Sequence, residues 1–316
     1  MTQASQEPSF TLPESTPRSS KTEFIIGGLR VFIYGLDEIK NQSQAETELA
    51  VLYLAHGRTL DYHSTEIVAQ EVLHRYRSEA REKKVDLIAV TLDLSNHGER
   101  KISERANQSW DGGNETHAQD MLSIVTVATH DFQLLIDYLP TYLPPHYTNF
   151  HNIMSGISLG GHTSWRVAQA LGPTKIHGMA PLIGSPNHSA LLVTRLGVGK
   201  PILASLAEDL ISYSYDDLAV HLNETQKRRW PRALADLIQA GDRAAAEQFP
   251  AKIEILIQNG DSDPLVPDIY TAPWVQRAKE QGRGKLAYIV QPNTGHTVTK
   301  EMVANLADWL GRLFAA

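Results

Sequence analysis

Short apolar runs alternate with stretches of helical periodicity along most of the chain. The clearest run, Leu49–Ala55, is almost continuously apolar, which is typical of a parallel strand covered on both faces. The other runs that predict strands are 24–26, 29–34, 85–92, 150–155, 176–183, 251–258 and 286–291. The stretches that predict helices are 64–82, 118–139, 162–171 and 299–313. This alternation predicts an α/β fold with a mostly parallel central sheet flanked by helices.

Two segments depart from the alternation. Residues 1–21 are rich in Ser, Thr, Pro and Gln, so we expect a disordered N-terminal tail. Residues 185–250 have helical character without a clear strand and follow the sixth core strand. An insertion of this size predicts a helical cap or lid over a site. The remaining segments, 22–184 and 251–316, are predicted to form the α/β core.

Composition and charge exclude several classes of function. The net charge is −7 and no basic stripe occurs, so we expect no nucleic-acid partner. The chain has no cysteine, which excludes disulfides, thiol catalysis and cysteine-ligated metals. Neither a signal-peptide core nor an apolar run of about 20 residues is present. We therefore expect a cytoplasmic protein without a membrane span, either a monomer or a homodimer.

One short motif suggests catalysis. Residues Gly156–Gly161 fit the pattern G-x-S-x-G and lie between a predicted strand and a predicted helix. A serine on such a sharp turn presents its hydroxyl above the sheet edge, and only glycines fit around it. The amides at the start of the following helix point toward the same place, where they would stabilise an oxyanion. Ser158 is therefore the candidate nucleophile.

An acid and a histidine follow at the ends of later predicted strands. Asp263 lies in a turn after the strand 251–258, and His296 lies in a Gly-containing loop after the strand 286–291. Asp261 is a rival for the acid, two residues before Asp263. The histidine would act as general base and then acid, and the aspartate would orient it. The order Ser158, Asp263, His296 differs from the orders of the chymotrypsin and subtilisin types.

Over residues 24–316 the chain resembles the α/β-hydrolase superfamily, with 184–250 in the place of the variable cap. His56-Gly57-Arg58 is similar to the family's oxyanion loop, and Gly260-x-x-Asp263 is similar to its acid-bearing turn. The resemblance favours Asp263 over Asp261. It also implies an oxyanion hole made by the backbone amides of Leu159 and Arg58.

A closer resemblance is to a group of largely uncharacterised fungal-type hydrolases. These pair an H-G-R loop with an N-H-G-x-R loop and a W-x-x-G-N-x-x-H-x-x-D-M segment. The corresponding residues here are Asn96–Arg100 and Trp110–Met121. This resemblance implies no particular substrate.

Several residues near these motifs have two interpretations. The Arg58 side chain either points inward, where it would bind a substrate carboxylate, or points outward into a surface salt bridge. His56, Gly57, His97 and Trp110 are candidates for contact with substrate. For His97 we favour a turn residue bonded to the backbone, and for Trp110 a residue that pins a long loop. No His-x-x-x-His pair with a neighbouring Glu lies on a convincing helix, so we expect no metal site.

Together these features predict a serine hydrolase that needs no cofactor. It would cleave a carboxylic ester or thioester of a small apolar molecule through an acyl-enzyme. The same residues could instead catalyse carbon–carbon bond hydrolysis, acyl transfer or a lyase step, since fold does not fix reaction. A non-catalytic ligand-binding protein on the same scaffold is the alternative from another class.

Overall fold

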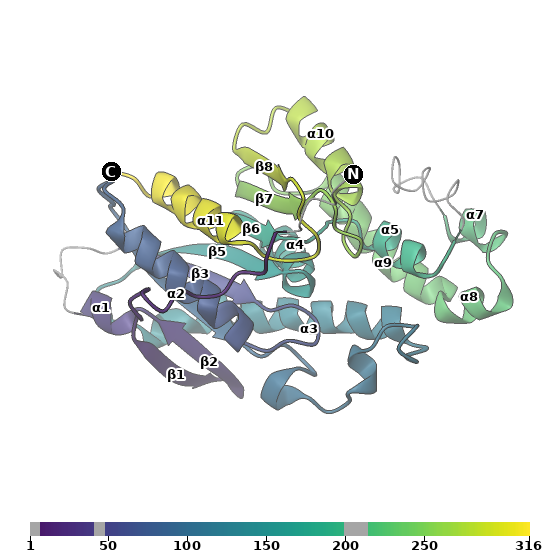
Figure 1. Ribbon diagram of the computed structural model, residues 1–316, viewed down its shortest axis with the longest axis horizontal. Coiled ribbons are helices and arrows are strands. Elements are labelled where there is room, and N and C mark those ends of the chain that lie inside the picture. Colours follow the sequence, from purple (N-terminus) through teal and green to yellow (C-terminus); the bar gives the residue numbers. More distant parts are fainter. Residues whose placement is uncertain (1–6, 41–47, 199–213) are drawn as a thin grey trace.

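The computed structural model describes residues 7–40, 48–198 and 214–316, and its main feature is an eight-stranded sheet (Figure 1). The strand order is β1-β2-β4-β3-β5-β6-β7-β8. Strand β2 pairs antiparallel with β1 and β4, and the other neighbours are parallel. The bounds are β1 Lys21–Ile26, β2 Leu29–Tyr34, β3 Glu48–Ala55, β4 Asp86–Leu92, β5 Asn149–Ile157, β6 Gly178–Leu182, β7 Glu254–Gly260 and β8 Leu286–Gln291. The predicted mostly parallel sheet is confirmed.

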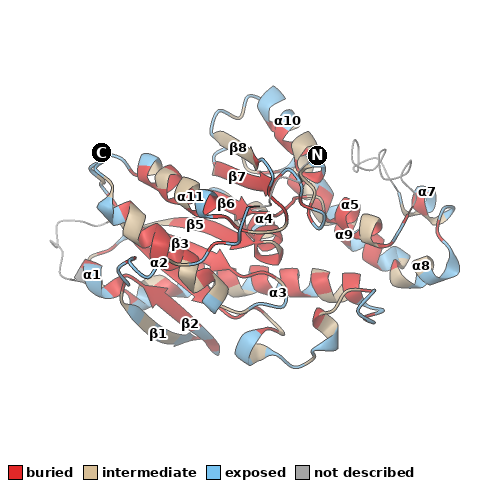
Figure 2. Cartoon of the chain, in the orientation of Figure 1, coloured by how far each residue is buried: buried red, intermediate tan, exposed pale blue. Residues whose placement is uncertain are grey.

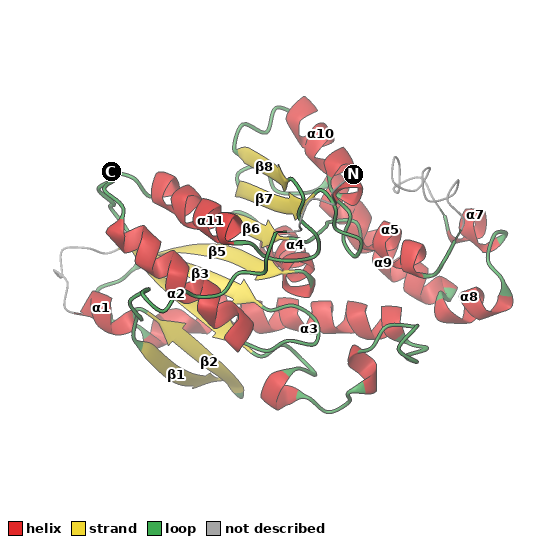
Figure 3. Ribbon diagram, in the orientation of Figure 1, coloured by secondary structure: helices red, strands yellow, loops and turns green. Residues whose placement is uncertain are grey.

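Helices cover both faces of this sheet (Figure 3). On one face α2 (His63–Ser78) packs beside α11 (Lys300–Leu313). On the other face lie α3 (His117–Tyr138), α4 (Leu159–Leu171) and α10 (Ala272–Glu280). The remaining α-helices are α1 Leu36–Lys40, α5 His188–Arg195, α7 Tyr215–Ala219, α8 Glu224–Arg229 and α9 Arg232–Glu247.

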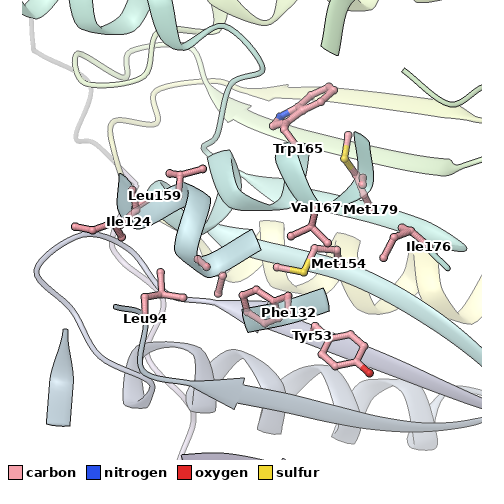
Figure 4. Close-up of a cluster of buried hydrophobic side chains, with 14 of the residues drawn as sticks. Tyr53, Leu94, Ile124, Phe132, Met154, Leu159, Trp165, Val167, Ile176 and Met179 are labelled. Carbon is pink, nitrogen blue, oxygen red and sulfur yellow. The ribbon is translucent and has the colours of Figure 1, made fainter. Parts of the chain in front are cut away.

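Strand β3 is apolar at nearly every position because helices cover both of its faces. Leu49, Val51 and Tyr53 belong to the hydrophobic cluster under α3 and α4, whereas Leu52 and Leu54 belong to the cluster under α2 and α11. Successive side chains point to opposite faces, so a strand covered twice needs apolar residues throughout. Figure 2 shows the central strands as buried. In Figure 4 the Phe132 ring of α3 lies close to Tyr53.

The segment between β6 and β7 forms helices α5, α7, α8 and α9 within its described part. Residues 199–213 of this insertion lie outside the described residues. A buried ion pair joins the insertion to the core, because Arg166 of α4 donates to Asp242 of α9 over 2.6 Å. Asp242 also accepts the backbone N–H groups of His188 and Ser189. The helical insertion after the sixth strand is present, and its action as a lid remains a prediction.

Residues 7–20 differ from the expected disordered tail. Their backbone bonds to the loop after β8, with Glu7 N donating to the Asn293 carbonyl and Phe10 N to the Val298 carbonyl. Further along, Thr16 and Ser19 bond to side chains of α2. The polar composition suggested disorder, but Phe10 is an apolar anchor that is only 6% exposed. Residues 1–6 lie outside the described part of the chain.

No helix among the described residues is both long and apolar enough to cross a membrane.

Candidate active site

Ser158 occupies a tight turn between β5 and α4. Its backbone has a φ of 54°, in the left-handed region that side-chain-bearing residues rarely adopt. Backbone hydrogen bonds hold the turn, since Ser158 N donates to the Leu182 carbonyl and His162 N donates to the Ser158 carbonyl. The turn places the Ser158 hydroxyl at the carboxyl ends of the parallel strands.

Two later loops bring His296 and Asp263 to this hydroxyl. Ser158 Oγ lies 2.8 Å from His296 Nε2, and His296 Nδ1 lies 2.7 Å from Asp263 Oδ2. With the imidazole proton on Nδ1, the ring donates to the carboxylate and accepts from the serine hydroxyl. The structure therefore brings together the three residues that the sequence singled out, although 138 positions separate the serine from the histidine.

The local contacts of Asp263 set it apart from Asp261. The second oxygen of Asp263, Oδ1, accepts the N–H groups of Leu265 (2.8 Å) and Val266 (2.9 Å). Burial by itself raises the pKa of Asp263, but the hydrogen bond and charge of His296 and these two amides hold it below its usual value. Asp261 is exposed and accepts from Ser262 and Thr294, so it lies outside the contact with His296.

The loop after β3 lies directly against the serine. A Cβ built on Gly57 would lie 3.8 Å from the Ser158 Cβ, and Gly57 and Arg58 line the same cavity as Ser158 and His296. Leu159 is the first residue of α4, and first-turn N–H groups have no partner within their own helix. The backbone around Arg58 and Leu159 is thus close to the serine hydroxyl, as an oxyanion hole requires.

His56 differs from its expected role as a substrate contact. It is fully buried, its Nδ1 lies 2.8 Å from the Gly57 carbonyl, and its Nε2 accepts the N–H of Leu94 over 2.9 Å. Burial lowers the pKa of His56 to about 4, so the ring is neutral at neutral pH. Both ring nitrogens bind backbone, and His56 therefore ties the end of β3 to the end of β4.

His97 and Trp110 also bond to their own surroundings. His97 Nδ1 lies 2.8 Å from the Ser95 carbonyl, and Trp110 Nε1 donates to the Glu115 carbonyl over 3.3 Å. Both side chains are buried, and Trp110 packs edge-on against His117. These contacts fit the turn and loop-pinning interpretations.

The Arg58 side chain points inward. It is partly buried, its Nη1 donates to the Asn107 carbonyl, and burial lowers its pKa below the usual value. Among the carboxylates of the described residues, none forms a salt bridge with it. The outward salt-bridge alternative therefore does not hold within this part of the chain.

A cavity of about 250 Å³ opens beside the Ser158 hydroxyl. Its lining is mainly apolar and comprises Ser9, Phe10, Gly57, Arg58, Leu60, Ser64, Ile67, Val68, Ile157, Ser158, Ile183, His296, Thr297 and Val298. Ser9 and Phe10 were missed from the sequence, because they belong to the segment expected to be disordered. Two apolar residues in an otherwise polar stretch, Phe10 and Leu12, could have indicated that this segment packs against the core. In the described ranges, no group of three or more His, Asp or Glu side chains could hold a metal ion.

Solved structures with a similar fold match nearly the whole chain. TT1662 from Thermus thermophilus has a TM-score of 0.63 at 17% identity, covering 95% of this chain and 100% of that chain. A thermostable carboxyl esterase from Bacillus coagulans, in complex with glycerol, has a TM-score of 0.54 at 14% identity, covering 95% and 100%. An acylaminoacyl peptidase from Pyrococcus horikoshii has a TM-score of 0.57 at 10% identity, and the match spans 42% of that longer chain. These neighbours share the fold of this chain.

The sequence itself gives the family. Residues 52–309 match the Alpha/beta hydrolase family, and the chain belongs to it. No curated protein matches the chain in sequence. The resemblance to the fungal-type group remains a prediction.

Proposed function

We propose that this α/β hydrolase is a serine hydrolase that cleaves a carboxylic ester or thioester through an acyl-enzyme. The observation that carries the proposal is the unbroken pair of contacts from Ser158 through His296 to Asp263. A serine hydroxyl is a weak nucleophile by itself and needs a base within hydrogen-bond reach. His296 supplies this base, and Asp263 holds its proton on Nδ1.

The proposed reaction has two halves. In the first, Ser158 Oγ attacks the carbonyl carbon while His296 Nε2 takes the hydroxyl proton, and the imidazolium then protonates the leaving alkoxide or thiolate. The backbone amides of Leu159 and the Arg58 loop hold the negative oxygen of the tetrahedral intermediate. In the second half, His296 activates water, which releases the acid and restores Ser158. The small, largely apolar cavity supports a small apolar acyl group beside the nucleophile.

The test combines covalent labelling with turnover. We expect a fluorophosphonate probe to modify the wild-type protein, with the adduct on the peptide that contains Ser158, and to leave Ser158→Ala unmodified. We also expect para-nitrophenyl esters of short acids and matching thioesters to be hydrolysed. Equal labelling of both proteins would refute the assignment of the nucleophile.

Labelling without turnover of any ester or thioester would instead favour carbon–carbon bond cleavage, acyl transfer or a lyase step on the same residues. Tight ligand binding that survives Ser158→Ala, with neither labelling nor turnover, would favour a binding protein.

A change at Phe10 tests whether the N-terminal segment limits the acyl group. Phe10 lines the cavity and belongs to the same hydrophobic cluster as Val68, Ile157 and Val298. In Phe10→Leu we expect a loss of about 1 kcal/mol in the free energy of unfolding, because this is a modest apolar replacement. We also expect the preference among para-nitrophenyl esters to move toward longer acyl chains, since the smaller side chain enlarges the cavity.

The matched control for Phe10 is Leu12→Val. Leu12 packs against the same hydrophobic cluster but is not part of the cavity lining. Its replacement should lower stability by a similar amount and leave the chain-length profile in place. An identical profile in Phe10→Leu and wild type would show that Phe10 does not limit the acyl group.

A further inference from the structure

Two partly buried arginines, Arg58 and Arg195, lie close to the active site. Arg58 lines the cavity that contains Ser158 and His296. Arg195, at the end of α5, donates from Nη2 to the carbonyl of Leu265, two residues beyond Asp263. Its Nη1 lies 3.6 Å from the sulfur of Met121 on α3. Arg195 therefore spans the space between the acid-bearing turn and α3.

Neither arginine forms a salt bridge within the described ranges, in contrast to Arg166 and Arg100. Arg166 pairs with Asp242 over 2.6 Å, and Arg100 pairs with Asp131 over 2.7 Å. Arg58 and Arg195 bond only to neutral acceptors, a backbone carbonyl in one case and a carbonyl and a thioether in the other. Neutral acceptors use some of the guanidinium N–H donors but give neither arginine an ion-pair partner.

The two charges act on the same group of side chains. His117 is 1% exposed, its Nδ1 bonds to the Gln108 carbonyl, and its buried Nε2 has no hydrogen-bond partner. Burial, together with smaller contributions from the charges of Arg58 and Arg195, lowers the pKa of His117 to about 4. Burial, with a smaller contribution from the charge of Arg58, likewise lowers the pKa of Arg195 to about 10. The contacts place both guanidinium groups near this histidine. Arg58 bonds to Asn107, the neighbour of Gln108, and Arg195 contacts Met121, one turn along α3 from His117.

Neither guanidinium group has an anionic partner of its own among the described residues. Asp263, the carboxylate whose charge acts on Arg195, is engaged by His296 and two backbone amides. Guanidinium groups bind carboxylate and phosphate oxygens through paired, charge-assisted hydrogen bonds. A substrate that carries such a group would supply the missing charge.

We infer that Arg58 and Arg195 form an anion subsite, so that the substrate of the Ser158 centre carries a carboxylate or phosphate group besides its ester bond. This inference rests on the proposed function. The apolar part of the cavity near Phe10 then holds the hydrocarbon portion, and the two arginines fix the charged end. Holding the charged end orients the ester carbonyl toward Ser158.

The test uses two esters that differ only in charge, mono-para-nitrophenyl glutarate and para-nitrophenyl valerate. We expect the wild type to have the higher kcat/KM for the glutarate ester. In Arg195→Met and Arg58→Met the ratio of glutarate to valerate kcat/KM should fall at least about tenfold, the effect of losing one charge-assisted hydrogen bond. Arg195→Lys should retain part of the ratio, because the charge remains.

The matched control is Arg283→Met. Arg283 is partly buried and bonds to the carbonyls of Phe249 and Pro250, but it lies before β8, at the sheet edge opposite Ser158. Its replacement should leave the ratio of the two esters within about twofold of wild type. If the ratio fell as far in Arg283→Met as in Arg195→Met, the effect would be one of general destabilisation, and the inference would be overturned.

Binding without turnover separates this inference from the proposed function. Calorimetric titration with glutarate and with inorganic phosphate should show binding to wild type that weakens at least about tenfold in Arg195→Met. The stronger of the two ligands identifies the class of anion. If Ser158 is labelled but neither anion binds and the glutarate ester has no advantage, the anion subsite is refuted while the serine hydrolase stands. If the anions bind but Ser158 stays unlabelled, the proposed serine hydrolase is refuted while the anion subsite stands.

Discussion

Replacing Asp263 by asparagine is expected to lower kcat/KM by about ten-thousandfold, as loss of the aspartate does in enzymes with this arrangement. The structure gives a specific reason. Asp263 Oδ1 accepts the N–H groups of Leu265 and Val266, so the asparagine oxygen would keep that position and its amino group would face His296 Nδ1. Nδ1 would then have to accept, which puts the imidazole proton on Nε2. A protonated Nε2 cannot take the proton of Ser158.

Asp261→Asn is the matched control. Asp261 is exposed, and its oxygen accepts from Ser262 and Thr294, which an asparagine oxygen can also do. We expect kcat/KM within about threefold of wild type, because surface changes of this kind have small effects. Steady-state kinetics on one ester, with circular dichroism to check folding, measures both variants. A large loss in Asp261→Asn with little loss in Asp263→Asn would reverse the assignment of the acid.

The sheet could be predicted because it depends on patterns that span a few residues. The strands around Leu52 and Val90 are apolar at nearly every position, since both of their faces are covered. The strand ends then place Ser158, Asp263 and His296 at one edge of the sheet, because parallel strands finish together. The position of each motif at the end of a predicted strand was thus enough to predict that these three residues lie together.

The surroundings of these residues could not be predicted in the same way. His56 was expected to contact substrate, yet its two ring nitrogens bind Gly57 and Leu94, a choice that depends on the exact separation of two strand ends. Phe10 was placed in a disordered tail because local composition is polar, whereas its burial depends on residues that are distant in sequence. No motif or pattern near Arg195 in the sequence indicated that it would lie near the active site. Contacts of this kind depend on tertiary packing, which a single sequence does not show.

Gly160→Ala is expected to lower the free energy of unfolding by about 3 kcal/mol or more, because a methyl group has no room at this position. A Cβ on Gly160 would lie 2.8 Å from the Ala55 Cβ and closer still to the Ala55 carbonyl, at the end of β3. Gly156 is also confined, since its Cβ would lie 2.5 Å from the Gly160 carbonyl and 2.7 Å from the Ala55 carbonyl oxygen. Neither neighbour is a flexible side chain, so α4 would have to move away from the sheet. Urea denaturation measures the loss.

A control variant separates the steric clash at Gly160 from the general effect of replacing glycine by alanine. Gly284 has no atom within 4 Å of its built Cβ, and its φ lies outside the left-handed region, so Gly284→Ala should be neutral or stabilise by up to about 1 kcal/mol. If Gly160→Ala remains folded, displacement of α4 should still shift Ser158 and the Leu159 amide, which precede Gly160 directly, and fluorophosphonate labelling should slow markedly. Stability and labelling at wild-type levels in Gly160→Ala would mean that the contact between α4 and β3 is looser than the structure shows. A joint loss of stability and labelling would instead show that the position of the nucleophile depends on the close approach of α4 to β3 at Gly160.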